Sequence, residues 1–362
     1  AAPTLEKSAT FELTGTSDEE TTLRGTVSGP LGTVASRLTF WYSDRDGFIE
    51  NFGPAEDAGG RESWGGRGKF QWDVSDTFSA LVTARYAESE NSSQFVMAEV
   101  FDAPLPGLMQ ADVIAPAVAG DENDRVNTNT SSISETDDWS LSLKLNWDIN
   151  DTLDLTSITA YREIETKLRT DVDQTPLPFE AASTNSFFLV YEDDFFQPSE
   201  ADSFSQELRL HGTGSIVDWT VGAYFSRFEE DVVDTSAFYV GSPGVPDSGF
   251  MIDRGTLNDY KNDSLAIFGD VEWQLNDSLS LLTGVRWTRE EIDYTLAQVS
   301  NIAPTNVLSN DFSDEGVTGR LSLRWAPSDD TNFYATVSQG YKGPGLSFTS
   351  TVSTTDLSLI HI

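Results

Sequence analysis

The sequence predicts an all-β protein, an antiparallel transmembrane β-barrel, and three observations support that prediction. Four tryptophans each precede a short polar turn that contains Asp: Trp72, Trp147, Trp273 and Trp325. Each turn lies between two stretches in which apolar and polar residues alternate, the pattern of strands with one apolar face. The tryptophans are 75, 126 and 52 residues apart, so hairpins recur while the connections between them vary. A propeller or solenoid would keep a fixed period.

Six short turns divide the chain into about twelve strands. The turns lie near residues 29–32, 72–76, 147–151, 212–215, 273–277 and 325–329. Gly, Pro, Asn and Asp supply the tight-turn conformations at these places. The strand before the third turn carries Leu141, Leu143, Leu145 and Trp147 on one face, and the return strand runs about nine residues to Tyr161. That length is close to the ~9–11 residues of a tilted membrane-spanning strand.

Long polar connections are expected at the other end of the hairpins. They cover roughly residues 44–62, 88–138, 163–203, 228–263 and 289–316. Acidic residues are concentrated in these segments. Short turns at one end and long loops at the other are typical of outer-membrane barrels, whose long loops lie outside the cell. The four turn tryptophans are then expected to form a membrane-interface girdle at the inner side.

Composition excludes several classes of function. The chain has 59 Asp and Glu against 22 Lys and Arg, a formal net charge of -37, which disfavours a nucleic-acid partner because phosphate attraction requires positive charge. It has no cysteine and two distant histidines, so we expect no metal site. No run approaches the roughly 20 apolar residues of a transmembrane helix. The first residues lack the pattern of a signal peptide.

One loop is rich in aromatic residues and is a candidate surface for contact with an apolar or aromatic ligand. The candidate contact residues are Phe187, Phe188, Tyr191, Phe195 and Phe196. The alternative is that this segment extends strands above the membrane or packs one loop on another.

Ordered motifs along the chain resemble the barrel of TonB-dependent outer-membrane receptors. They lie at residues 27–31, 37–51, 155–162, 204–210, 218–225 and 333–342. The resemblance implies a barrel of about 22 strands plugged by an N-terminal domain. It also implies uptake of a scarce ligand, most often a ferric siderophore, across the outer membrane of a Gram-negative bacterium. Residues 1–362 are accordingly expected to form a partial barrel domain without a plug domain, and the contact with the TonB complex would lie in the missing plug.

Basic residues at the polar positions of the strands are expected to line the lumen wall, because charge is costly against lipid. They are Arg67, Lys69, Arg85, Lys144, Arg209, Arg286, Arg320 and Arg324. In the setting of the family this wall packs against the plug. We expect these side chains to pair with carboxylates of the lumen or plug in preference to binding ligand directly.

No catalytic motif is found, so we expect a transporter that is not an enzyme and carries no cofactor. The sequence has no nucleophile elbow, P-loop or paired-histidine zinc motif. Two other functions stay open: a passive porin-like barrel, and a surface β-protein used for adhesion. The repeated turn-proximal tryptophans argue against the adhesion protein, because a girdle serves a membrane interface.

Overall fold

The computed structural model describes residues 2–17, 19–92, 116, 125–171, 190–191, 195–240, 250–328 and 330–343. Every regular element in these residues is a β-strand. No helix in this part of the chain is long and apolar enough to cross a membrane.

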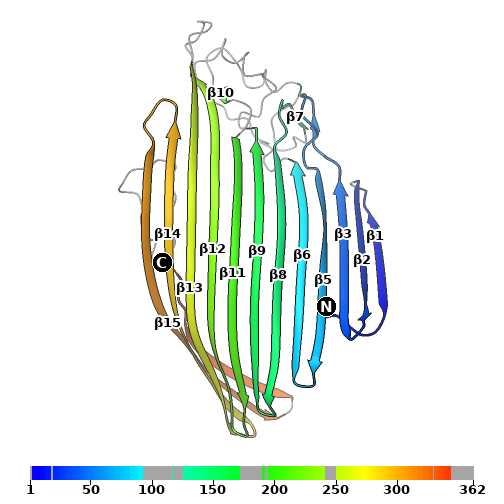
Figure 1. The fold of residues 1–362 in the computed structure, drawn as a ribbon, viewed down its shortest axis with the longest axis vertical. Coiled ribbons are helices and arrows are strands. Elements are labelled where there is room, and N and C mark those ends of the chain that lie inside the picture. Colours follow the sequence, from blue (N-terminus) through cyan, green and yellow to red (C-terminus); the bar gives the residue numbers. More distant parts are fainter. Residues whose placement is uncertain are drawn as a thin grey trace.

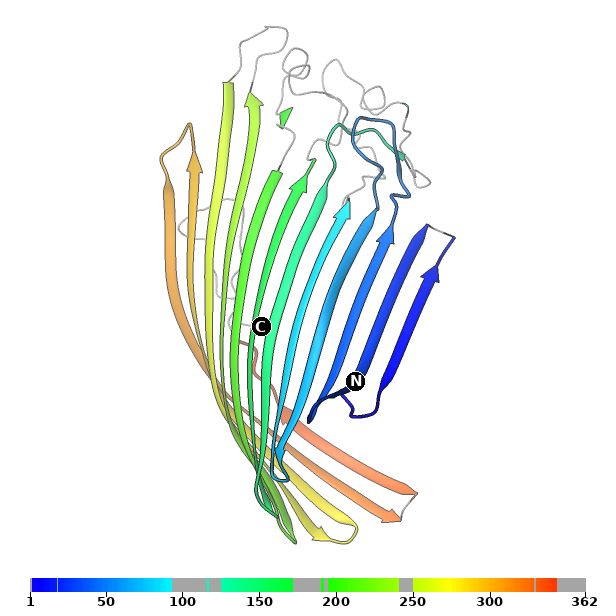
Figure 2. The same cartoon turned by 45° about the vertical axis from the view of Figure 1, so that its right-hand side comes forward.

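One antiparallel sheet of 14 strands dominates the molecule, and its strands lie side by side in chain order (Figure 1). The strands of its main path are β1 (Ser8–Gly15), β2 (Glu20–Leu31), β3 (Val34–Arg45), β5 (Arg61–Ser75), β6 (Phe78–Ser92), β8 (Ile133–Asn150), β9 (Leu153–Thr170), β11 (Phe195–Thr213), β12 (Val217–Val240), β13 (Phe250–Asn276), β14 (Leu279–Ser300), β15 (Asn306–Ser328) and β16 (Thr331–Gln339). The short β10 (Val190–Tyr191) pairs with β12, and β4 (Glu50–Asn51) forms a parallel pair with β7 (Arg125–Val126). The sheet is strongly curved, but β1 and β16 do not pair with each other (Figure 2).

All six predicted short turns are present, and they lie at one end of the sheet (Figures 1 and 2). Three of them share a local hydrogen bond, in which a side-chain oxygen accepts from the backbone N–H two residues later. Asn150 Oδ1 accepts from Thr152 N at 3.0 Å, Asn276 Oδ1 from Ser278 N at 3.0 Å, and Ser75 Oγ from Thr77 N at 3.3 Å. This explains why an Asn or Ser two positions before a Ser or Thr recurs at the turns.

The main path of the sheet has one strand more than predicted, the eight-residue β1. The expectation of about twelve strands began with residues 23–28, whereas β1 precedes them and pairs with β2 over its whole length. Phe11 and Leu13 alternate with Glu12 there, but this alternation is too short to stand out in the sequence. The main path of the sheet therefore has thirteen strands among the described residues.

Several predicted long loops are largely strand, so that part of the sequence prediction was wrong. The segments expected at 228–263 and 289–316 continue the ladders of β12, β13, β14 and β15, and the connection from β14 to β15 is only residues 301–305. Parts of 44–62, 88–138 and 163–203 are likewise strand. Above the apolar band charged residues such as Arg227 and Glu229 occupy outward positions, so the strands lose the alternation that marks them in sequence while keeping their backbone hydrogen bonds.

Two outer connections, residues 46–60 and 125–132, are tied together by Asn51. Its Nδ2 donates to Thr128 Oγ1 at 3.1 Å and to Ala55 O at 3.0 Å, and its Oδ1 accepts from Thr128 N at 3.0 Å. A Cβ at Gly53 would lie 2.0 Å from Thr128 O, so only glycine allows this close approach. The outer end of the first hairpins is therefore covered by an ordered loop pair.

Candidate functional site: the two faces of the barrel wall

Cross-strand partners point to the same side of a sheet, so the register assigns each strand residue to one of two faces. We call the face that carries Trp72, Trp147, Trp273 and Trp325 the outward face and the opposite one the lumenal face. The outward face is apolar over much of its height, and large side chains on it are exposed, among them Ile267 (58%). The buried strand residues are mostly on the lumenal face, including Asp138, Ala266, Ile292 and Tyr294. Crowded side chains on one face are what the inside of a curved sheet requires.

The four turn tryptophans all lie on the outward face next to the short turns, on β5, β8, β13 and β15. Their exposed fractions are nearly equal, between 42% for Trp273 and 50% for Trp72. Trp325 stacks on Phe333 with ring centres 5.5 Å apart. Large amphipathic rings at one level of an apolar face are the arrangement found at a membrane interface.

A second aromatic level, not predicted from the sequence, lies at the outer end of the apolar band. It consists of Trp64, Tyr86, Trp139 and Tyr161 on the outward face. Trp64 contacts Tyr86 at 5.4 Å between ring centres, and Trp139 contacts Tyr161 at 5.0 Å. Each tyrosine hydroxyl donates to a carboxylate of a neighbouring strand, Tyr86 to Asp137 and Tyr161 to Asp202. These rings have an apolar body toward the band and a polar tip toward water, so we call them the outer girdle.

The spacing between the two girdles fits a bilayer. Trp64 precedes Trp72 by eight residues on β5, and Trp139 precedes Trp147 by eight on β8. Eight residues at about 3.3 Å each cover roughly 26 Å along a strand, or about 20 Å along the membrane normal for a tilt of ~40°. This is near the ~25 Å apolar band of outer-membrane barrels. The eight-residue interval was present in the sequence and could have identified the outer girdle.

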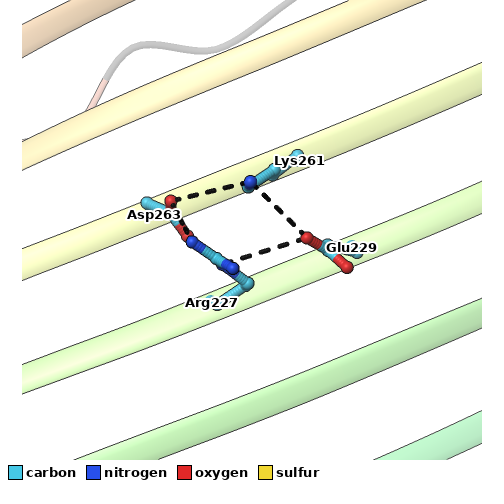
Figure 3. Close-up of polar contacts among 4 residues, drawn as sticks. All are labelled: Arg227, Glu229, Lys261 and Asp263. Carbon is cyan, nitrogen blue, oxygen red and sulfur yellow. Dashed lines mark hydrogen bonds and ion pairs between the residues drawn. The ribbon is translucent and has the colours of Figure 1, made fainter.

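Charged residues occupy the outward face directly above the outer girdle. On β12 and β13, Arg227 and Lys261 alternate with Glu229 and Asp263 in a closed set of four contacts (Figure 3). Arg227 Nε lies 2.7 Å from Asp263 Oδ1 and Lys261 Nζ lies 3.7 Å from Glu229 Oε1. We call these four residues the outward quartet. It marks the level at which the apolar band ends on these two strands.

A row of carboxylates crosses six neighbouring strands of the outward face; it begins beside the outer girdle, where Glu88 directly faces Trp64, and lies above the outward quartet on β12 and β13. Direct cross-strand partners in this acidic row are Glu88, Asp137, Glu165, Glu200, Asp231 and Asp259. Burial, together with the facing Asp259 carboxylate, raises the pKa of Asp231. Like charges directly opposite one another destabilise a sheet. The acidic row thus concentrates negative charge on the outer section of the outward face.

The eight basic residues predicted for the lumen wall all lie on the lumenal face. Their partners differ: Arg85 contacts Asp138, Arg209 lies 2.8 Å from Glu207 and Arg320 lies 3.0 Å from Asp270. Arg286 lies over the rings of Tyr224 and Phe268, and Arg324 donates to Asn332 at 3.2 Å. For Arg67, Lys69 and Lys144 no hydrogen bond or ion pair is formed with any residue that the structure describes. Three of the eight thus pair with lumenal carboxylates.

Asp138 is the centre of a lumenal cluster that the sequence did not reveal. It is 7% exposed and binds two arginines of the flanking strands. Arg162 donates from Nε at 2.9 Å and from Nη2 at 3.0 Å, and Arg85 donates from Nη1. The guanidinium of Arg85 also lies over the ring of Trp41, 5.7 Å from its centre. Arg162 follows Tyr161 directly, so its lumenal direction could have been read from the alternation, but its partner could not.

The structure describes the aromatic ligand-contact candidates only in part. Phe187 and Phe188 lie outside the described residues, and Tyr191 and Phe195 are placed by their backbones alone, in β10 and β11. Phe196 is 40% exposed, and its carbonyl accepts a hydrogen bond from Thr235 Oγ1 at 3.2 Å. Its pairing with Arg169 puts it on the outward face. Among the described residues no three His, Asp or Glu side chains form a group that could hold a metal ion.

Comparison with known proteins agrees with this architecture. A model of the family described as TonB dependent receptor-like, beta-barrel, matches residues 101–357. The pesticin receptor of Yersinia pestis is 30% identical over 154 residues, which cover 40% of this chain and 20% of that relative. The pesticin receptor of Yersinia enterocolitica is 27% identical over the same length and shares of the two chains.

Solved structures share the fold. The ferric yersiniabactin uptake receptor FyuA from Yersinia pestis superposes on 98% of this chain with a TM-score of 0.72 and 18% identity. The siderophore receptor PiuA from Acinetobacter baumannii superposes on 93% with a TM-score of 0.64 and 13% identity. The chain covers 50% and 49% of these two proteins. It therefore corresponds to about half of a receptor of this kind.

Proposed function

Because this chain belongs to the TonB-dependent receptor β-barrel family, we propose that it forms part of the wall of an outer-membrane receptor that imports a ferric siderophore. The receptor would lie in the outer membrane of a Gram-negative bacterium and draw its energy from the TonB complex through a plug. The family match over residues 101–357 carries this proposal. Relatives named as receptors for ferric yersiniabactin and another siderophore support the ligand class.

The geometry of the wall agrees with this role. Two aromatic girdles bound an outward apolar band, and the opposite face is polar and carries arginines and lysines at membrane height. In a membrane, one layer of strands would then separate lipid from water, as transport through a barrel requires. The aromatic candidates Phe187, Phe188, Tyr191, Phe195 and Phe196 remain a proposed contact surface for ligand at the outer end.

Uptake by whole cells tests the proposed function. Cells of the source bacterium with and without the gene would be grown with and without iron, and accumulation of radioactive iron from siderophores would be followed. We expect induction by iron starvation, and uptake that requires both the gene and the proton-motive force. Uptake that persists after the force is collapsed would indicate a passive porin instead. Induction by a sugar or another nutrient would refute the siderophore while leaving a transporter.

A further inference from the structure

The residues that follow β16 cross the lumenal face instead of continuing the strand. β16 ends while β15 still extends far beyond it, and we call the next residues, 340–343, the strap. The ring of Tyr341 lies against Gly316 of β15, in the space that a side chain at this glycine would fill. Gly343 lies against the carboxylate of Glu290 on β14. The strap therefore passes over two strands on the inside of the wall.

The sequence of the strap fits another position, a continuation of β16 along the free edge of β15. Trp325 is paired with Phe333, and the same register continued would place Tyr341 opposite Val317 on the outward face. Val317 precedes Trp325 by eight residues, the interval between the two girdles on β5 and β8, and Trp287 is its direct partner on β14. In that position Tyr341 would belong to the outer girdle.

An acceptor for the tyrosine hydroxyl is in place there. Tyr86 and Tyr161 of the outer girdle each donate to a carboxylate two residues outward of their direct cross-strand partner. Glu315 has the same relation to Val317, which would be the direct partner of Tyr341. The continued strand would thus repeat the side-chain arrangement of the outer girdle.

The neighbouring lysine also has a place in the continued strand. Lys342 is exposed in the strap, whereas the continued register would put it opposite Gly316 on the lumenal face. Two residues outward of this glycine, Asp314 directly faces Glu290. Burial and the Asp314 carboxylate raise the pKa of Glu290, while Arg286 opposes them. Because carboxylates directly opposite each other repel, an ammonium group beside this pair would stabilise it.

Both arrangements satisfy the same side chains, so they are alternatives of similar energy. In the strap the hydroxyl of Tyr341 donates to Asp314 Oδ2 at 3.1 Å. In the continued strand Tyr341 would donate to Glu315, and Lys342 would take its place beside Asp314. Pro344 limits the continuation to the four residues of the strap, because proline has no N–H for the ladder.

We propose that the strap exchanges between the lumenal face and the edge of β15, and so narrows or widens the lumen at the level of the outer girdle. This inference rests on the proposed function, because the outward position of Tyr341 is favourable at a membrane interface. In the observed arrangement the strap occupies space on the lumenal side of β14 and β15. In the other arrangement the same residues join the wall and leave that space to a solute.

Fluorine NMR of the intact receptor in lipid discs tests the exchange. With 3-fluorotyrosine at Tyr341, a spin-labelled lipid broadens the signal of the outward position, whereas the wall shields the lumenal one. We expect part of the signal to be broadened. The matched controls carry the label at Tyr86, which is outward and should be broadened fully, and at Tyr294, which is lumenal and should not be broadened.

Two variants should shift the populations in opposite directions. Gly316→Ala places a methyl group where the ring of Tyr341 lies in the strap, so the ratio of outward to lumenal signal should rise about ten-fold. Lys342→Gln removes the cation that would stabilise the two lumenal carboxylates in the continued strand. The same ratio should fall about two-fold in this variant.

Equal populations in the unsubstituted receptor and both variants would overturn the inference. So would a signal broadened completely in all three, since the segment would then be permanent strand, or broadened in none, since it would be a permanent strap. The label at Tyr86 reports whether Gly316→Ala folds, and Lys342→Gln provides the test if it does not. The spectra require no transport, so a failure of cells to import iron would refute the proposed function separately.

Discussion

Asp138 shows how a single residue ties three strands together on the lumenal face. It extends from β8 and binds Arg85 of β6 and Arg162 of β9 while almost fully buried. A buried carboxylate is stabilised only while its cationic partners are present, whereas the two arginines are themselves partly exposed. The residue therefore matters to stability more than the many exposed ion pairs of the outer strands.

Asp138→Ala should destabilise the intact receptor by about 2 kcal/mol, because the guanidinium groups of Arg85 and Arg162, which are partly exposed, lose their shared hydrogen-bonded counter-charge. The measurement is denaturant unfolding in detergent followed by tryptophan fluorescence. Asp263→Ala in the water-exposed outward quartet removes a comparable Arg–Asp pair and should cost about 1 kcal/mol or less. Equal losses in the two variants would show that Asp138 has no special role.

At the scale of the strand, the long elements such as β8, β12 and β13 consist of a membrane section and an outer section, and different residues occupy the outward positions of each. Leu143 of β8 lies midway between Trp139 and Trp147 on the outward face, and Ser142 beside it is lumenal. In the outer section, as on β12 and β13, charged residues occupy the outward positions. The division follows from what the outward face would meet, which is lipid in the membrane section and water in the outer section.

A pair of neighbouring substitutions tests the faces of a strand. Leu143→Arg should cost about 2–4 kcal/mol, because a charge would enter the middle of the hydrocarbon layer. Ser142→Arg, one residue away, should cost less than about 1 kcal/mol, because its side chain extends into the lumen. Unfolding of both variants of the intact receptor in lipid vesicles gives the comparison. A larger loss for Ser142→Arg would reverse the assignment of faces.

The membrane section could be predicted from the sequence and the outer section could not. Between the girdles one face is apolar, so alternation identifies residues such as Leu141 and Leu143, and the polar turns are marked by Asn, Asp and Gly. Above the girdle charged residues occupy outward positions of the strands, so Glu229 and Lys261 look like loop residues although they are cross-strand partners. The Asp138 cluster could not be predicted without knowing the strand register, because Arg85 and Arg162 are 53 and 24 residues from Asp138 in the sequence.

At the scale of the whole molecule, the sheet has two unsatisfied edges. Every residue of β1 and of β16 is exposed, and in the described part of the chain each strand has a neighbour on one side only. A row of unpaired backbone groups is not tolerated in lipid and promotes aggregation in water. The remaining strands of the receptor would supply the missing partners.

Residues 1–362 expressed alone should therefore aggregate or remain unfolded in detergent. The intact receptor, refolded under the same conditions, should give a single species that resists heat in gel electrophoresis. Size-exclusion chromatography and gel mobility before and after heating provide the measurement. A monodisperse, heat-resistant product from the isolated chain would refute this prediction.

As girdles at the two membrane interfaces, the two aromatic levels would also give the protein a fixed hydrophobic thickness. Eight residues of tilted strand separate them, about 20 Å along the normal, which is less than the ~30 Å hydrocarbon core of an average bilayer. A rigid sheet cannot lengthen its apolar band, so the surrounding lipid must thin to meet it, at a cost for each ångström of mismatch. The wall is thus matched to a thin membrane, and a thicker membrane would exclude it by elastic strain alone.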